Sequence, residues 1–533
     1  MPSSALTTSA QTGLTSARGR QRPGITLAIM LCAQLMIVLD LSVVNIALPS
    51  IASGLHFSAA SLSWVLNAYA LTFGGLLLLG GRAGDILGRR RVFLAGLALF
   101  TAASLAGGLA TTASLLLAAR AVQGVGGAIA TPAVLAIIVS GFPDGRERTR
   151  ALGLFTAVVM GGGSLGLVLG GVITEWFSWR WVLFINVPIG IAVLLIGPRF
   201  IPESPRQPGK LDLGGAITST TGMSALVYAF IRASSNGWSN SLTLAAFAAA
   251  AVLLATFVAI ETRSAQPITP LRLFTDGSRA ASYVVRLLLV AGMFGMFFFL
   301  TQFVQEVLGL SPLLAGLAFL PMTAALFAVS RLAPVLIPRF GSKPLMIAGL
   351  IPAVAGMAWL GQLSAGSSYL SGVLGPMLLL GGGMGVAFVP LTLTSLAGVA
   401  PQDSGAAASM VNVTQQVGGA LGLSILVTVY GTASRAAARH PLPHAGPVAQ
   451  AHHILTHGMA VSFTVAAAFD LCALLVVLVA IRTRGPAQAA SPVRADDIAV
   501  EADGEVELVA AAETDSTVPV PAAGAADLMA DRT

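Results

Sequence analysis

The chain has 533 residues, of which 55% are hydrophobic and only 10% are charged, and its mean hydropathy is +0.84. This composition supplies too little polar surface to coat a water-soluble particle, so it predicts a polytopic membrane protein. Both cysteines, Cys32 and Cys472, fall in apolar segments, so the sequence suggests no disulfide framework. The net charge of +7 does not indicate a nucleic-acid partner, because 27 of the 29 basic residues are arginine, as is typical of a G+C-rich genome.

The two ends of the chain differ from its middle. Residues 1–23 are rich in Ser and Thr and carry three arginines just before the first apolar segment. That segment is too long for the core of a signal peptide, so we expect a short tail followed by a membrane span. Residues 485–533 hold ten acidic and two basic residues and no aromatic residue, which predicts a disordered acidic tail.

Fourteen apolar segments are each long enough to cross a hydrocarbon core of about 30 Å. Helices are the only plausible spanning element at these lengths, so we expect an all-α protein with 14 transmembrane helices. The predicted spans are 24–52, 61–81, 91–111, 113–140, 151–174, 181–200, 211–232, 240–261, 281–305, 312–337, 343–363, 371–397, 404–432 and 457–482.

The basic residues orient these spans. An even number of spans puts both termini on one side of the membrane. If that side is the cytoplasm, the inner loops and flanks hold twenty Lys and Arg, and the outer loops hold four. Cytoplasmic loops carry the excess of positive charge in membrane proteins. The sequence therefore predicts a multi-pass protein of the cytoplasmic membrane with both termini in the cytoplasm.

Two opposite charges are predicted at one depth inside the membrane. Asp40 lies in the first span and Arg120 in the fourth. At 1.5 Å per residue, Asp40 is ~22 Å from the inner face and Arg120 ~12 Å from the outer face, within a core of about 30 Å. On neighbouring helices they would form a buried structural ion pair, or Asp40 would exchange protons or bind a cationic substrate. For Asp470, near the middle of the last span, structural and functional interpretations both stay open.

The junction of the second and third spans reads GRAGDILGRRR, from Gly81 to Arg91. Asp85 and Arg89 are four residues apart, a spacing at which they pair across one helical turn, and the glycines permit a tight turn. The stretch resembles the loop signature of the major facilitator superfamily, G-x-x-x-D-x-x-G-R-[KR]. This resemblance implies a cytoplasmic gate made of Gly81, Asp85, Gly88, Arg89 and Arg90. A shorter copy, RFGSKP, begins at residue 339, as an internal repeat would place it.

Three more stretches are similar to one branch of that superfamily. RAVQGVGGA begins at Arg120, VLDLSVVNIALP contains Asp40 and Asn45, and WRWVLFINVP begins at Trp179. They resemble signatures of the fourteen-span drug:H⁺ antiporters of the EmrB/QacA type, and the resemblance covers roughly residues 25–482.

The fifth span departs from the antiporter pattern. Its GGSLGLVLGG has Leu167 where that family has proline. Small residues four apart let helices approach closely, so we expect the remaining glycines to pack against a neighbouring helix, without the kink that proline would give. These glycines are Gly162, Gly166, Gly170 and Gly171.

The resemblance implies the major facilitator fold: two six-helix bundles, 24–200 and 281–482, around a central cavity, with an extra linking pair at 211–261. It also implies proton-coupled export of drugs or natural products by alternating access. The substrates would be amphipathic compounds, cationic or aromatic ones among them. Asp40 and Arg120 would couple transport to protons. A polar path would be lined by Asn45, Gln123, Asn412, Gln415 and Gln416.

Other functions remain open at this point. They are an uptake symporter, a flippase for lipid-like substrates, or a membrane sensor with vestigial transport. The sequence has no G-x-x-x-x-G-K-[ST] loop, so the proton gradient rather than ATP is the implied energy source. We expect no enzyme activity, no cofactor and no metal site. The expected partners are protons, small-molecule substrates and the lipid bilayer, and we expect a monomer.

Overall fold

The structure is a computed structural model that describes residues 23–141, 146–203, 212–264, 267, 269, 271–399, 404–443 and 446–482. The chain divides into two compact units, residues 1–483 and 484–533. The predicted acidic tail, 485–533, and residues 1–22 of the predicted N-terminal tail lie outside the described residues. Everything below concerns the first unit.

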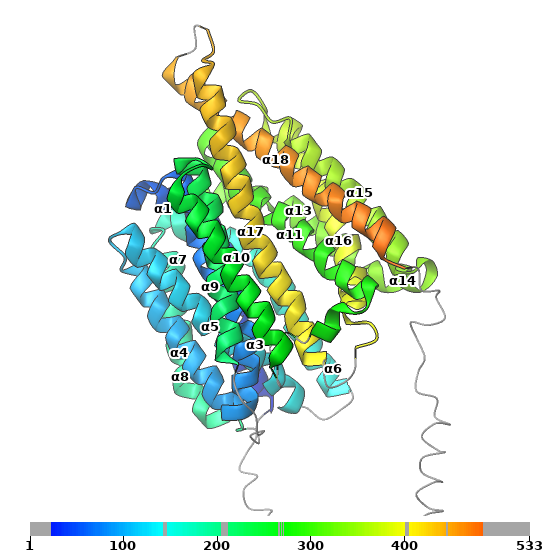
Figure 1. The fold of residues 1–533 in the computed structure, drawn as a ribbon. Helices are drawn as coiled ribbons and strands as arrows, with labels where there is room; N and C mark the ends of the chain where they lie inside the picture. Colours follow the sequence, from blue (N-terminus) through cyan, green and yellow to red (C-terminus); the bar gives the residue numbers. More distant parts are fainter. Residues whose placement is uncertain are drawn as a thin grey trace, which may run out of the picture. The chain divides into compact units, whose positions relative to one another are not determined.

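The described part of the chain is helical throughout and contains no strand (Figure 1). The first eight helices, hereafter the N-terminal bundle, are α1 (Pro23–Leu55), α2 (Ala59–Leu62), α3 (Trp64–Leu87), α4 (Arg89–Gly108), α5 (Ala113–Gly141), α6 (Arg146–Trp176), α7 (Trp181–Phe184) and α8 (Asn186–Phe200). Two further helices follow, α9 (Leu213–Asn236) and α10 (Ser241–Arg263).

The remaining elements form the C-terminal bundle. They are the 3₁₀ turn η1 (Leu271–Phe274), α11 (Gly277–Gln302), the π-helical turn η2 (Phe303–Val307), α12 (Pro312–Ala318), α13 (Leu320–Ser330), α14 (Ala333–Phe340), α15 (Ser342–Leu360), the π-helical turn η3 (Tyr369–Leu374), α16 (Gly375–Leu396), α17 (Ser404–Arg439) and α18 (Pro447–Ala480). Together these elements confirm the predicted all-α polytopic fold.

Twelve helical segments in the described residues are long and apolar enough to cross a membrane. Two predicted spans are not among them. The span 151–174 lies in α6, in which Leu165–Trp176 is an apolar stretch among the described residues, and the span 211–232 lies in α9, which is rich in Ser, Thr and Gly. Both are helices of sufficient length, 31 and 24 residues. The count of fourteen spans therefore stays a prediction.

The two ends of the bundle differ in how its halves pack. We call the end with the α3–α4 loop and its three arginines (Arg89–Arg91) the arginine-rich end, and the end where α1 stops at Leu55 the opposite end. Towards the opposite end, one continuous hydrophobic core joins both bundles, from Val43 of α1 to Phe299 of α11. Towards the arginine-rich end, each bundle has a core of its own. The halves thus share a core at one end and have separate cores at the other, where α17 packs on α3.

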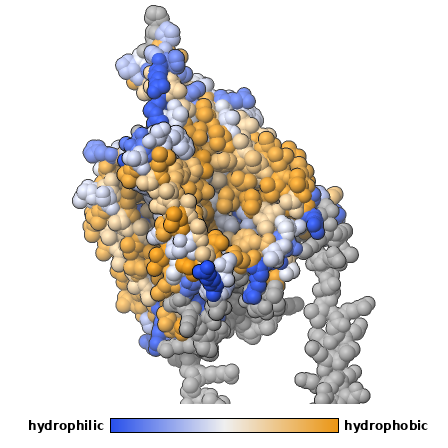
Figure 2. Space-filling view, viewed as in Figure 1, coloured by the Kyte–Doolittle hydropathy of each residue, from blue (hydrophilic) through white to orange (hydrophobic). Residues whose placement is uncertain are grey.

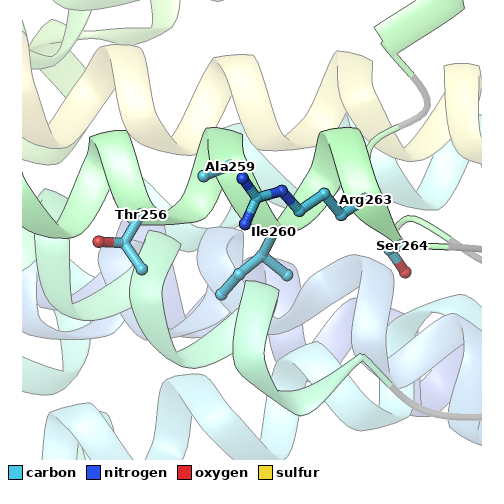
Figure 3. A pocket seen from close by; sticks show the side chains of 5 residues that line it. All are labelled: Thr256, Ala259, Ile260, Arg263 and Ser264. Atoms are coloured by element: carbon cyan, nitrogen blue, oxygen red, sulfur yellow. The ribbon is translucent and has the colours of Figure 1, made fainter.

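The pair α9–α10 lies against the seam between the bundles. Helix α9 packs on α3 and α17, and Thr428 Oγ1 of α17 donates to the Phe230 carbonyl oxygen of α9 at 2.7 Å. In Figure 1 this pair lies beside α17. Helix α10 exposes most of its apolar side chains, and hydrophobic residues cover most of the visible flank in Figure 2. A hollow on α10, near Arg263, is lined by residues of that segment alone (Figure 3).

The backbone shows the internal repeat directly. Gly88, before α4, has φ +103°, and Gly341, before α15, has φ +80°, a region that favours glycine. The two lie 253 positions apart, and so do Gly96 and Gly349. A Cβ atom at Gly96 would meet the backbone of Gly126 and Ala130 at 2.8 Å, and one at Gly349 would meet the backbone of the corresponding α16 residues. Helices α4 and α5 are therefore repeated as α15 and α16.

Candidate functional site

The structure brings Asp40 of α1 and Arg120 of α5 together. Their side chains are 0% and 1% exposed, and Arg120 Nη1 donates to Asp40 Oδ2 at 2.5 Å. The similar depths calculated from the sequence are thus matched by direct contact. Buried charges are found in membrane proteins where they face protein and pair with one another, and this pair does both.

Three more side chains complete the surroundings of the carboxylate. Gln123 Nε2 of α5 and Asn186 Nδ2 of α8 donate to Asp40 Oδ1 at 2.7 and 2.9 Å. Gln123 Nε2 also lies 2.8 Å from Ser104 Oγ of α4. Sequence reasoning missed Asn186 and Ser104 as site residues. Asn186 stands inside the quoted WRWVLFINVP stretch, whereas a lone serine in α4 gives no signal.

The guanidinium of Arg120 is held from several sides. Its Nε donates to the Val65 carbonyl oxygen of α3 at 3.0 Å, and Nη1 donates to Gln123 Oε1 at 2.7 Å. Its Cζ lies 4.5 Å from the centre of the Tyr69 ring, a cation–π distance. Arg120 Nη2 has no hydrogen-bond partner among the described residues. The arginine therefore has one spare donor inside the protein.

This arrangement suits an ionised carboxylate. Both oxygens of Asp40 accept hydrogen bonds, and Arg120 balances the charge. A proton on Asp40 would remove the counter-charge and leave a buried guanidinium unpaired, which is costly. The site can therefore take up a proton only if Arg120 finds another partner or the helices around it move. That coupling between charge and helix position is what a proton-driven switch requires.

The five residues predicted to line a polar path are not gathered at this site. Gln123 contacts Asp40, as described above. Asn45 and Gln416 are buried, and each has a side-chain polar atom without a hydrogen-bond partner among the described residues. On α17, Gln415 is half-buried and Asn412 is exposed. A continuous path through them stays a prediction, as does the central cavity.

The predicted gate at the arginine-rich end is folded within the N-terminal bundle. Arg89 Nη2 pairs with Asp85 Oδ1 at 3.1 Å, and Arg89 Nη1 donates to the Ala136 carbonyl oxygen of α5 at 3.3 Å. Arg90 Nε lies 3.5 Å from Glu203 Oε2, just after α8. Gly88 supplies the positive φ between α3 and α4, and Gly81 packs beside Pro132. Glu203 was missed because its distance in sequence from the motif gives no sign of proximity.

The four glycines of α6 lie at helix contacts. Gly162, Gly166 and Gly170 face α1, where a Cβ atom at Gly170 would lie 2.9 Å from the Val43 backbone. Gly171 faces α12 of the other bundle, where an added Cβ atom would lie 2.6 Å from the Pro312 carbonyl oxygen. Leu167 is buried in an unbroken helix that contains no proline.

The aromatic segment Phe294–Glu306 is largely core in this conformation. Phe298, Phe299 and Phe303 are fully buried in the core that joins the two bundles. Gln305 Nε2 donates across the bundles to the Ile46 carbonyl oxygen at 3.0 Å. These residues close the opposite end.

Comparison with known proteins identifies relatives over most of the chain. The family model described as Major Facilitator Superfamily matches residues 30–423. A cephamycin export protein of Amycolatopsis lactamdurans is 40% identical over 447 residues, which are 81% of this chain and 92% of that protein. A puromycin resistance protein of Streptomyces alboniger is 41% identical over 458 residues, 85% of this chain and 89% of that protein.

Solved structures share the fold at low sequence identity. The nucleoside transporter NupG superposes with a TM-score of 0.60 at 12% identity, covering 86% of this chain and all of that one. A bacterial homologue of the human lysosomal transporter Spinster, in an inward-facing and occupied conformation, gives a TM-score of 0.59 at 15% identity, covering 89% and 100%.

Proposed function

Because the chain belongs to the Major Facilitator Superfamily, we propose that it exports a drug or natural product across the cytoplasmic membrane in exchange for protons. The relatives at 40% and 41% identity are named for cephamycin export and puromycin resistance, which supports an antibiotic-like substrate. The observation that carries the proton coupling is the buried Asp40–Arg120 pair. The fourteen-span antiporter branch is part of the same proposal.

We propose that the arginine-rich end faces the cytoplasm, together with both termini. The conformation described here then faces inward, since the bundles share a core only at the opposite, outer end. The two bundles would be the moving bodies. Alternating access would break the outer contacts, such as that between Gln305 and Ile46, and bring together the two inner cores.

The proposed switch is the charge state of Asp40. While ionised, the carboxylate holds α1 to α5 and α8 through Arg120, Gln123 and Asn186. A proton arriving from outside weakens these charge-assisted bonds and releases Arg120, whose spare Nη2 can then take another acceptor. Return of the proton to the cytoplasm restores the pair. Substrate export is coupled to this cycle if drug and proton favour opposite states.

Transport in inside-out membrane vesicles tests the function. Vesicles containing the protein should accumulate labelled puromycin when the interior is acidified, and an uncoupler should abolish the accumulation. Vesicles with Asp40→Asn should still bind the drug but not concentrate it. Glu147→Gln, which removes an exposed carboxylate of α6, is the matched control and should transport normally. Accumulation only in right-side-out vesicles would instead indicate uptake and contradict the proposal.

A further inference from the structure

Asp470 is a buried carboxyl that the mechanism above does not use. It lies in α18 with 0% exposure, and neither of its oxygens has a hydrogen-bond partner among the described residues. Its side chain faces Gly292 of α11, where an added Cβ atom would lie 3.3 Å from Asp470 Oδ1 and 3.6 Å from the Met357 methyl group. The described residues around the carboxyl therefore offer it no hydrogen-bond donor.

The internal repeat explains why no counter-charge is present. With the shift of 253 positions, Met293 and Met357 stand where the N-terminal bundle has Asp40 and Ser104. Gly126 of α5 and Gly383 of α16, which make corresponding contacts, lie 257 positions apart. That shift puts Met377 and Leu380, both buried, at the positions of Arg120 and Gln123. The C-terminal bundle thus has methionine and leucine where the other has its ionic network.

Charged and titratable groups on the helices around Asp470 have other contacts or lie elsewhere. Helix α18 packs on α11, α15, α17 and η2. Arg279 donates to the Ala397 and Gly398 carbonyl oxygens, Arg286 donates to Thr392, and Lys343 donates to the Leu478 carbonyl oxygen.

The remaining groups on these helices are two tyrosines, Glu306, and charged or titratable side chains near the helix ends. The Tyr283 hydroxyl donates to the Ser395 carbonyl oxygen, and the Tyr430 ring stacks on Phe299. Glu306 is in η2, and the Arg435 and Arg439 side chains are exposed at the end of α17. On α18 itself, the nearest histidine, His457, is thirteen residues away, about 20 Å along the helix. None of these groups donates a hydrogen bond to Asp470.

The depth of Asp470 matches a transition in the packing. Along α18, Ala466 and Ala467 belong to the core that joins the two bundles, and Ala473 belongs to the separate core of the C-terminal bundle. Asp40 lies next to the corresponding transition in α1, where Ile37 belongs to the separate core and Leu39 to the joint one. Both carboxyls thus lie at the depth where the joint core ends, and opening of that core would let water reach this depth.

We propose that Asp470 is a second proton-binding site, independent of Asp40. An ionised carboxylate without donors or a counter-charge is very costly in such surroundings, so Asp470 holds a proton in this conformation while Asp40 is ionised. When the bundles rearrange and water reaches this depth, Asp470 releases the proton. The inference goes beyond export coupled to Asp40, because it adds a second exchangeable proton in the other bundle.

Infrared spectroscopy of the purified full-length protein tests the site without any substrate. The wild type should show the carbonyl band of a protonated carboxyl. This band should shift in D₂O and disappear reversibly at alkaline pH. Asp470→Asn should lack the band, Asp470→Glu should move it, and Asp40→Asn should retain it. Glu306→Gln is the control for the exposed carboxyl of η2 and should also retain the band.

Two results would overturn the proposal. One is a band that persists in Asp470→Asn or vanishes in Glu306→Gln. The other is an Asp470 band that neither exchanges in D₂O nor responds to pH, because the proton would then be a permanent structural feature. If Asp470→Asn does not fold, the proposal is still tested by the response of the wild-type band to D₂O and pH and by its shift in Asp470→Glu. Since no transport is measured, failure here leaves the export function untouched.

Discussion

The two bundles use one helical scaffold to bury a carboxyl in two opposite ways. In the N-terminal bundle, Asp40 accepts hydrogen bonds from Arg120, Gln123 and Asn186. In the C-terminal bundle, Asp470 has no donor among the described residues, and its neighbour Met357 stands at the position of Ser104. The repeated backbone fixes where the helices cross. The side chains placed on it decide whether a carboxyl there is charged or neutral.

The largest expected effect comes from leaving Asp40 without its partner. Arg120→Met should destabilise the protein by about 3–5 kcal/mol, because the carboxylate stays buried without a counter-charge. The double variant Asp40→Asn/Arg120→Met should recover most of this loss but not proton-coupled transport. Thermal unfolding in detergent measures the stability of the single and the double variant. Equal stability of the single and double variants would mean that the ion pair contributes no coupling.

The close helix crossings should be nearly as sensitive, and equally so in both bundles. Gly96→Val and Gly349→Val would each force a side chain against the backbone of the facing helix. Overpacking of this kind costs about 1–3 kcal/mol. Gly382, where a Cβ atom meets nothing within 4 Å, gives the control Gly382→Ala. A large loss in only one bundle would show that the repeat is not a shared scaffold.

A direct comparison of the two carboxyls should give a smaller and asymmetric effect. Asp40→Asn leaves Arg120 buried without a counter-charge and should lower the unfolding temperature. Asp470→Asn replaces a neutral acid by a neutral amide of the same shape, so its unfolding temperature at neutral pH should stay close to the wild-type value. If both variants lost the same stability, Asp470 would be ionised as Asp40 is.

The smallest effect concerns the contact that closes the opposite end. Glu175, one residue beyond the predicted span 151–174, accepts hydrogen bonds from Ser311 and from the Leu313 amide at 2.9 Å. These donors lower the pKa of its carboxyl below the ordinary value. The closed contact is therefore favoured above the ordinary pKa of Glu175 and is weakened as the pH falls through the lowered one.

Distances between spin labels on the exposed Trp176 and Leu314, with Cys32 and Cys472 replaced by alanine, measure that closure. Outer acidification should broaden the distance distribution slightly. Glu175→Gln should show the broadening already at neutral pH, with no further response to acid. The change should be modest, because Glu175 is exposed and screened by solvent. An acid response that survives in Glu175→Gln would assign the effect to another group.

The sequence predicts the fold better than it predicts the site. Apolar length and loop charge identify most helices, because each span must satisfy its own backbone hydrogen bonds within the bilayer. The signal is weaker for α9, where Ser, Thr and Gly dilute the apolar character of the predicted span. Helices also continue past the predicted spans, as α17 does to Arg439, because water permits a helix to extend beyond the bilayer.

Within the site, the sequence identifies charges but not their neutral partners. Asp40 and Arg120 stand out, since each is costly in a membrane and their calculated depths agree. Asn186 and Ser104 are uncharged and cost little free energy in a membrane helix, so the sequence does not mark them out. Their position beside Asp40 follows from tertiary packing alone. Asp470 was visible as a charge, yet its isolation follows only from the residues that the structure places around it.

Proton movement in response to drug tests the central claim most directly. Inside-out vesicles are acidified in their interior, and a pH-sensitive dye reports the gradient when puromycin is added. The wild type and Glu147→Gln should release protons from the vesicles on drug addition, whereas Asp40→Asn should release none. Unchanged proton release in Asp40→Asn would contradict the claim that the Asp40–Arg120 pair couples protons to export.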